Sequence, residues 1–185
     1  MVAMPAVEHP LPEDDLLQTF LSLETPLGYK AELIDGEIIV TPPPDGSHET
    51  TFASLIRQFI RESATDFDIA GTKGLITPLG HFIPDGTVSP VGHFQDAEPW
   101  AGTAGVLLVF EVTSGNPAKD RDVKRRGYAA GLIPCYLLID RSRAEAVLFT
   151  DPVDGDYAAL TKVPFGKPLD LPAPFSFALD TTPLR

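Results

Sequence analysis

The spacing of apolar residues changes along the chain, and each spacing predicts one type of element. Apolar residues recur every three to four positions after Pro12 and again over 48–62, which predicts two amphipathic helices. A third helix is expected over 119–130. Alternating or continuous apolar runs predict strands at 31–34, 37–40, 68–79, 81–88, 106–112, 135–140, 144–150, 157–163 and 175–179. This order of elements predicts an α+β fold with a central mixed sheet flanked by helices.

The first two strands are expected to form a hairpin. Asp35-Gly36 separates them, and this dipeptide is the strongest short signal for a two-residue turn. In that register Ile34 faces Glu37 and Glu32 faces Ile39. The opposite side of the ribbon is fully apolar, so Glu32 is expected on the more polar side.

Length and pattern indicate one domain. The chain has 185 residues, without an internal repeat or a linker that separates two units. We expect residues 1–10 to be loose, a core at about 29–150, and a strand-rich, proline-rich tail at 151–185. Residues 89–105 are rich in proline and glycine and are expected to form a long surface connection.

Composition limits the function classes. The net charge of −12, from 26 acidic and 14 basic residues, argues against broad, sequence-independent binding of nucleic acid. It does not exclude a nuclease, because carboxylates that hold a metal add to the negative count. The single cysteine, Cys135, excludes an internal disulfide. No apolar stretch is long enough for a bilayer and the start lacks signal-peptide features, so a cytoplasmic protein without membrane contact is expected.

Glu111 is the most informative single residue. It interrupts an apolar run, Val106–Val112, that reads as a strand buried on both faces. An ionised carboxylate there costs several kcal/mol unless a cation or strong donors meet it. Asp85, after Pro84 at the end of another strand-like run, and Lys124, on the third helix, are candidate partners. Two carboxylates and a lysine that converge on a central strand from different elements suggest a divalent-metal site that cuts phosphodiesters.

The expected chemistry follows from these residue types. Magnesium prefers oxygen ligands and usually takes one or two protein carboxylates together with water and substrate phosphate. Asp85 and Glu111 are the candidate metal ligands for Mg²⁺ or Mn²⁺, and the backbone carbonyl of Val112 is a third. Lys124 is the candidate for holding the phosphate. Asp120, Lys124 and Tyr128 follow one helical stripe, so this row is expected to border the carboxylates.

Each of these residues also has a structural interpretation. Asp85 lies between proline and glycine and fits a turn. Glu111 fits a structural ion pair with an arginine, and Lys124 fits a solvated helix face. Tyr128 is expected to serve packing more than catalysis. The dense basic cluster at 119–126 also fits a solvated helix surface.

An ordered series of short motifs connects these candidates to a known family. The series resembles the bacterial Uma-two family, restriction endonuclease-like proteins of the PD-(D/E)XK nuclease superfamily, over about 29–150. The motifs that carry the resemblance are Glu32-Leu-Ile-Asp-Gly-Glu37, Thr41-Pro-Pro-Pro with His48, Pro84-Asp85, Glu111-Val-Thr-Ser114, Asp120 with Lys124 and Tyr128, Ala130-Gly-Leu-Ile-Pro134, and Tyr136-Leu-Leu-Ile-Asp140.

The resemblance implies a role for each residue of the site. Asp85 and Glu111 match the two metal-binding acids. Lys124 matches a lysine that this family has relocated from the position of Thr113. Glu32 matches a further acid near the site, and His48 matches a polar residue early in a helix.

The implied activity is hydrolysis of DNA phosphodiester bonds by metal-activated water. Cutting both strands of a duplex needs two sites, which makes a homodimer one option on functional grounds. A rival interpretation is a catalytically idle nuclease-like binding or assembly module, favoured by the acidic balance and by Thr113. Hydrolysis of a small phosphodiester or nucleotide is a third interpretation.

Overall fold

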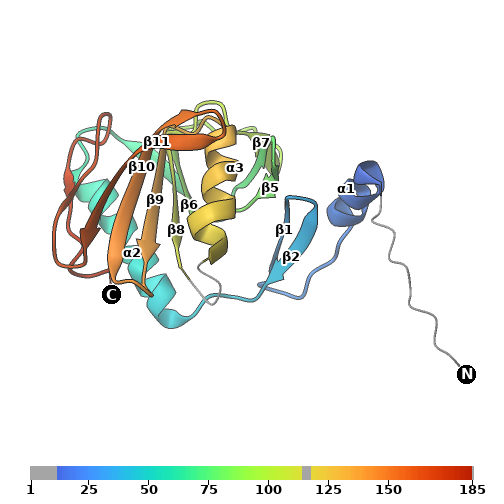
Figure 1. The fold of residues 1–185 in the computed structure, drawn as a ribbon, viewed down its shortest axis with the longest axis horizontal. Coiled ribbons are helices and arrows are strands. Elements are labelled where there is room, and N and C mark those ends of the chain that lie inside the picture. Colours follow the sequence, from blue (N-terminus) through green and yellow to red (C-terminus); the bar gives the residue numbers. More distant parts are fainter. Residues whose placement is uncertain (1–11, 114–117, 185) are drawn as a thin grey trace, which may run out of the picture.

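The computed structural model describes residues 12–113 and 118–184 (Figure 1). The expected loose segment at 1–10 lies outside this range, as do residues 114–117 between the expected strand at 106–112 and the expected helix at 119–130. The helices are α1 (Glu13–Leu21), α2 (Gly46–Glu62), the π-helical segment η1 (Lys119–Lys124) and α3 (Arg125–Ala130). The strands are β1 (Lys30–Ile34), β2 (Glu37–Thr41), β3 (Phe67–Ala70), β4 (Gly74–Thr77), β5 (Gly80–Phe82), β6 (Gly86–Pro90), β7 (Trp100–Gly102), β8 (Leu108–Val112), β9 (Cys135–Asp140), β10 (Glu145–Val153), β11 (Asp156–Pro164), β12 (Leu169–Asp170) and β13 (Ala178–Leu179).

The larger sheet has six strands in the order β11-β10-β9-β8-β6-β3. Strands β8 and β9 are parallel, whereas the other pairs are antiparallel. Parallel neighbours need a crossover connection. That connection contains η1 and α3, so the expected helix at 119–130 leads from the strand of Glu111 to its neighbour.

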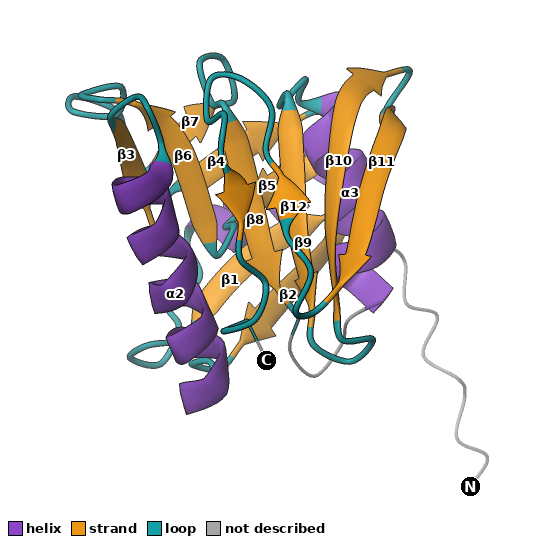
Figure 2. Cartoon of the chain, turned by 90° about the vertical axis from the view of Figure 1, so that its left-hand side faces the viewer, coloured by secondary structure: helices purple, strands orange, loops and turns teal. Residues whose placement is uncertain are grey.

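The two faces of this sheet are covered by different elements (Figure 2). On β8, Leu108, Phe110 and Val112 join a core cluster with α2 and the C-terminal tail. Val109 faces the other way and packs with Tyr128 of α3 and with residues of the second sheet. Side chains alternate along a strand, so Glu111 lies on the side of α3 and the second sheet.

The second sheet has five strands in the order β2-β1-β5-β4-β7. Its β1–β2 hairpin has the predicted register, with Glu32 opposite Ile39 and Ile34 opposite Glu37. Glu32 lies on the more polar side of the hairpin, as predicted, but that side is buried. Ile34 and Ile39 pack into a core cluster there, and Glu32 is only 3% exposed. The more polar side of the hairpin therefore faces the interior, whereas Val40 on the apolar side is half exposed.

The predicted continuous strands at 68–79 and 81–88 are wrong, because each run divides between the two sheets. Strands β3 and β6 belong to the larger sheet, whereas β4 and β5 belong to the smaller one. The chain changes sheets at 71–73 and again at 83–85. Asp85 consequently comes just before β6, not at the end of a strand, and it lies in the link between the sheets.

Two further predictions need correction. The expected connection at 89–105 contains β7, which pairs in parallel with β4. The expected strand at 175–179 shortens to β13, paired with β12. The strands at 135–140, 144–150 and 157–163 are confirmed, the last two with longer bounds. Among residues 12–113 and 118–184, none of the helices combines the length and apolar character that a membrane span requires.

Gly86 is the most restrictive glycine next to the candidate acids. A Cβ at this position would lie 2.0 Å from the Phe110 ring, which is fully buried. We predict that Gly86→Ala lowers the free energy of unfolding by about 1–3 kcal/mol through overpacking. Urea denaturation measures this change. The control is Gly102→Ala, because a Cβ there meets nothing within 4 Å. Equal stability of the two variants would contradict the prediction.

Candidate active site

A cavity of about 410 Å³ lies where the β1–β2 hairpin, the start of α2, the link before β6, the end of β8 and η1 meet. Titratable side chains line much of it. They are Lys30, Glu32, Asp45, His48, Asp85, Glu111, Lys119, Asp120 and Lys124. All five residues that the sequence singled out for the site, Glu32, His48, Asp85, Glu111 and Lys124, are therefore brought into one cavity.

Asp85 is held through both of its oxygens. Its Oδ1 lies 3.0 Å from Lys30 Nζ, and its Oδ2 lies 2.8 Å from His48 Nε2. The backbone N–H of Val112 donates a third bond, at 2.9 Å, to Oδ2. Burial raises the pKa of Asp85, but His48, Lys30 and Lys124 more than offset this, so the pKa lies well below its usual value. Asp85 is therefore ionised and tied to the end of β8.

Glu111 is held from the crossover helix. Lys124 Nζ lies 2.9 Å from Glu111 Oε1, and the Tyr128 hydroxyl donates a hydrogen bond to the same oxygen. The Glu111 residue is only 2% exposed. Burial raises the pKa of Glu111 to about 8, the carboxylates of Asp85 and Asp120 add to the increase, and Lys124 opposes it. The partner of this buried acid is a lysine, not the arginine that its structural interpretation expected.

Lys124 joins two strands through one ammonium group. Besides Glu111 on β8, it lies 3.4 Å from Glu32 Oε1 on β1. The same Glu32 oxygen accepts a hydrogen bond of 2.7 Å from the N–H of Ile83. Burial lowers the pKa of Lys124, but Glu111, Glu32 and Asp120 raise it well above its usual value. Lys124 is therefore charged and connects the hairpin to the central strand.

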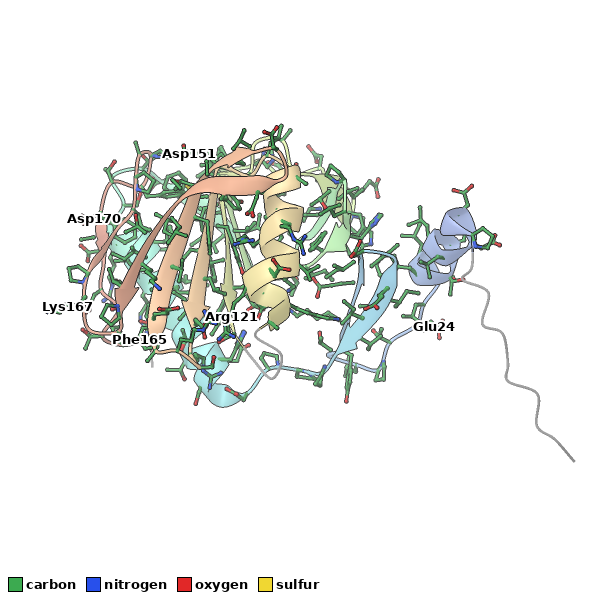
Figure 3. The ribbon with its side chains drawn as sticks, in the orientation of Figure 1. Glu24, Arg121, Asp151, Phe165, Lys167 and Asp170 are labelled. Carbon is green, nitrogen blue, oxygen red and sulfur yellow. The ribbon has the colours of Figure 1, made fainter. Side chains whose placement is uncertain are left out.

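The π-helical segment η1 brings Lys124 and Asp120 to the cavity. Arg121, at the start of this helix (Figure 3), binds Asp140 at the end of β9 through two bonds of 2.6 and 2.9 Å. The Tyr136 hydroxyl donates to the Asp120 carbonyl at 2.9 Å. Single π-turns within helices occur often at functional sites. Burial, with Asp85 and Glu32, raises the pKa of Asp120 to about 6 against the opposing charge of Lys124.

The start of α2 positions His48. The Asp45 side chain caps this helix by accepting a hydrogen bond of 2.7 Å from the N–H of His48. Arg141 in turn contacts Asp45 at 3.2 Å. His48 is only 5% exposed, so the cap places a buried ring against Asp85.

Lys30 was not predicted from the sequence as a site residue, and only packing was expected of Tyr128. Lys30 and Glu32 are two residues apart on β1, so their side chains point to the same side of the hairpin. Once Glu32 was a candidate, this spacing also indicated Lys30. Tyr128 packs in the core as expected, but it also donates to Glu111. For Val112, the structure shows the N–H bound to Asp85, and the proposed role of its carbonyl as a metal ligand stays a prediction.

The donor set of the cavity fits a divalent cation. Among the residues with described positions, no three or more His, Cys, Asp or Glu side chains gather closely enough to hold a metal. Magnesium does not need that many, because it often uses one or two carboxylates and keeps several waters. Four carboxyl groups, those of Glu32, Asp85, Glu111 and Asp120, share the cavity with the ammonium groups of Lys30 and Lys124. Burial first, and then the neighbouring carboxylates, raise the pKa of Glu111 and of Asp120 against the opposing charge of Lys124.

Comparison with known sequences identifies the family. The sequence profile of Uma2, described as "Putative restriction endonuclease", matches residues 17–182. The chain belongs to the Uma2 family. The expected Uma-two membership is thus confirmed. A comparison with curated proteins found no match.

A solved structure shares the fold of this chain. It is a crystal structure from Anabaena variabilis ATCC 29413, described as a putative nuclease belonging to DUF820. The TM-score is 0.68 at 16% sequence identity, over 91% of this chain and 96% of that chain. The fold is therefore restriction-endonuclease-like, an α+β arrangement with mixed sheets and flanking helices, as expected from the sequence.

Loss of Lys124 is expected to destabilise the protein in a pH-dependent way. We predict that Lys124→Met costs about 3 kcal/mol near pH 8, because Glu111 and Glu32 lose their buried cation. Burial already raises the pKa of Glu111 and Lys124 opposes this, so without Lys124 the native chain holds the Glu111 proton more tightly than the unfolded chain does. Stability of the variant therefore falls as pH rises from 5 to 8.

Urea denaturation at several pH values measures this effect. Lys162→Met is the matched control, because that side chain is 63% exposed and 3.9 Å from its nearest carboxylate. A loss for Lys124→Met that is no larger at pH 8 than at pH 5 would contradict the prediction.

Proposed function

We propose that this Uma2 protein is a metal-dependent endonuclease that hydrolyses DNA phosphodiester bonds. The observation that carries the proposal is the meeting of Asp85 and Glu111, from separate segments, at one cavity with Lys124 bound to Glu111. The description of the family as "Putative restriction endonuclease" and of the solved neighbour as "a putative nuclease" supports it.

Asp85 and Glu111 are the proposed ligands of Mg²⁺ or Mn²⁺, with the Val112 carbonyl as a third oxygen. A divalent ion held there supplies a water of lowered pKa and positive charge for the scissile phosphate. His48 and the N–H of Val112 fix the orientation of Asp85. Lys124 and Tyr128 fix one oxygen of Glu111, which leaves its other oxygen for the ion.

Positive charge within the cavity suits a phosphate. Lys119 lines the cavity and makes no ion pair with any residue whose position is described. Lys119 is therefore the first candidate contact for a phosphate entering from solvent, and Lys124 lies deeper beside Glu111. Arg141 at the Asp45 edge adds a further positive charge. A local basic strip can coexist with an acidic chain, so the net charge of −12 is compatible with a nucleic-acid substrate.

A catalytically idle, nuclease-like binding or assembly module is the second candidate. One observation favours it: both oxygens of Asp85 are already bound, by Lys30, His48 and the N–H of Val112. Only Oδ1, which accepts a single bond from Lys30, keeps a free lone pair for a metal unless one of these contacts changes. The cytoplasmic location is an expectation shared by both candidates, whereas the homodimer is expected only for the endonuclease.

The test is cleavage of supercoiled plasmid in the presence of Mg²⁺ or Mn²⁺. The wild-type protein is expected to nick or linearise the plasmid, and EDTA is expected to stop the reaction. We predict that Asp85→Asn and Glu111→Gln lower the rate by roughly 100-fold or more, as expected for loss of a group that stabilises transition-state charge. Asp170→Asn, at an exposed carboxylate far along the chain, is the control and should leave the rate unchanged.

The other outcomes separate the candidates. Intact plasmid together with a gel shift of the same DNA would support the idle binding module. Cleavage that continues in EDTA, or that is equal in Glu111→Gln and Asp170→Asn, would contradict a reaction at this site.

A further inference from the structure

Each of the two proposed metal ligands is held by its own lysine. Lys30 lies 3.0 Å from Asp85, and Lys124 lies 2.9 Å from Glu111. The lysines differ in burial: the Lys124 side chain is 9% exposed and contacts two carboxylates, whereas the Lys30 side chain is 24% exposed and contacts one. A partly exposed ion pair with one partner is the cheaper one to separate. Lys30 is therefore the lysine that can leave.

The ammonium of Lys30 also lies within the field of both acids. It lies 3.0 Å from Asp85, and Glu111 lines the same cavity. A positive charge attracted by both carboxylates occupies a region where a shared divalent ion would be stabilised. Lys30 and such an ion therefore compete for Asp85.

Lys30 has space to move. Besides the main cavity, its side chain borders a hollow of about 440 Å³ near α1 and another of about 250 Å³ beside Phe52 and Thr72. The backbone of Lys30 is fixed by the pairing of β1 with β2, at Thr41. Its four-carbon side chain can thus change direction without disturbing the hairpin.

We propose that Lys30 takes the place of the divalent ion on Asp85 in the metal-free protein and, when the ion binds, moves to contact a phosphate of the nucleic acid. This inference rests on the proposed function. It assigns Lys30 two successive partners: a carboxylate before the ion binds, and a phosphate afterwards. The exchange keeps Asp85 next to a cation throughout, which limits its repulsion with Glu111.

The test is Lys30→Met, which removes the charge and keeps a side chain of similar length. Because the competing charge is lost, we expect Mn²⁺ to bind roughly tenfold more tightly by calorimetry. A short DNA duplex, measured by fluorescence anisotropy with Ca²⁺ present, should bind more weakly. The slope of the logarithm of the DNA-binding constant against the logarithm of the salt concentration should become shallower by about the contribution of one phosphate contact.

Lys119→Met is the matched control, because Lys119 lines the same cavity and has no carboxylate partner in the described structure. It should weaken DNA binding in the same way and leave Mn²⁺ affinity within about twofold of wild type. Thermal unfolding shows whether each variant is folded.

The outcomes separate the inference from the proposed function. If wild type binds Mn²⁺ through Glu111 and Lys30→Met binds it no more tightly, only the inference is overturned. If neither protein binds Mn²⁺, the metal-dependent function is overturned with it. Binding by Lys30→Met alone supports the inference. If Lys30→Met does not fold, NMR of the wild-type protein replaces it, with the ¹³Cε resonance of Lys30 assigned by comparison with Lys30→Arg. The inference predicts that this resonance shifts when Mg²⁺ is added. An unchanged resonance would overturn the inference.

Discussion

The buried ammonium of Lys124 is the contact on which the rest of the site depends. It lies between Glu111 of the central strand and Glu32 of the hairpin, so one charge connects the two sheets and the crossover helix. An unpaired buried carboxylate would cost several kcal/mol, and this site contains more than one. The positive charge of Lys124 reduces the repulsion between the buried carboxylates but does not neutralise all of them. The proposed affinity of the cavity for a divalent ion rests on its carboxyl groups, which outnumber its lysines.

The fold explains how acids from distant parts of the chain meet. The parallel pair β8–β9 requires a crossover, and that crossover supplies Lys124 and Tyr128. Arg121 fastens the start of the same helix to Asp140 at the end of β9. The link between β5 and β6 passes from one sheet to the other and carries Asp85 to the end of β8. Rigid elements therefore determine the separation of the two proposed ligands.

Some of this was predictable from local pattern and some was not. The strand at 135–140 was readable because both of its faces are buried, and the hairpin was readable from Asp35-Gly36. Glu111 stood out because a carboxylate does not belong in an apolar run. The change of sheet at 71–73 and 83–85 was hidden, since a strand pattern looks the same in either sheet. The hairpin register placed Lys30 on the side of Glu32, but its pairing with Asp85 was hidden, because Asp85 is 55 residues away and is reached only after the sheets assemble.

The most direct test of the central claim is anomalous diffraction at the manganese edge from wild-type crystals soaked in Mn²⁺. The account predicts one peak within about 2.0–2.6 Å of an oxygen of Asp85 and an oxygen of Glu111, the distance range of divalent-ion ligands. In the same map Lys124 should still contact Glu111. A well-soaked crystal without a peak between these two carboxylates, or with manganese bound only elsewhere, would contradict it.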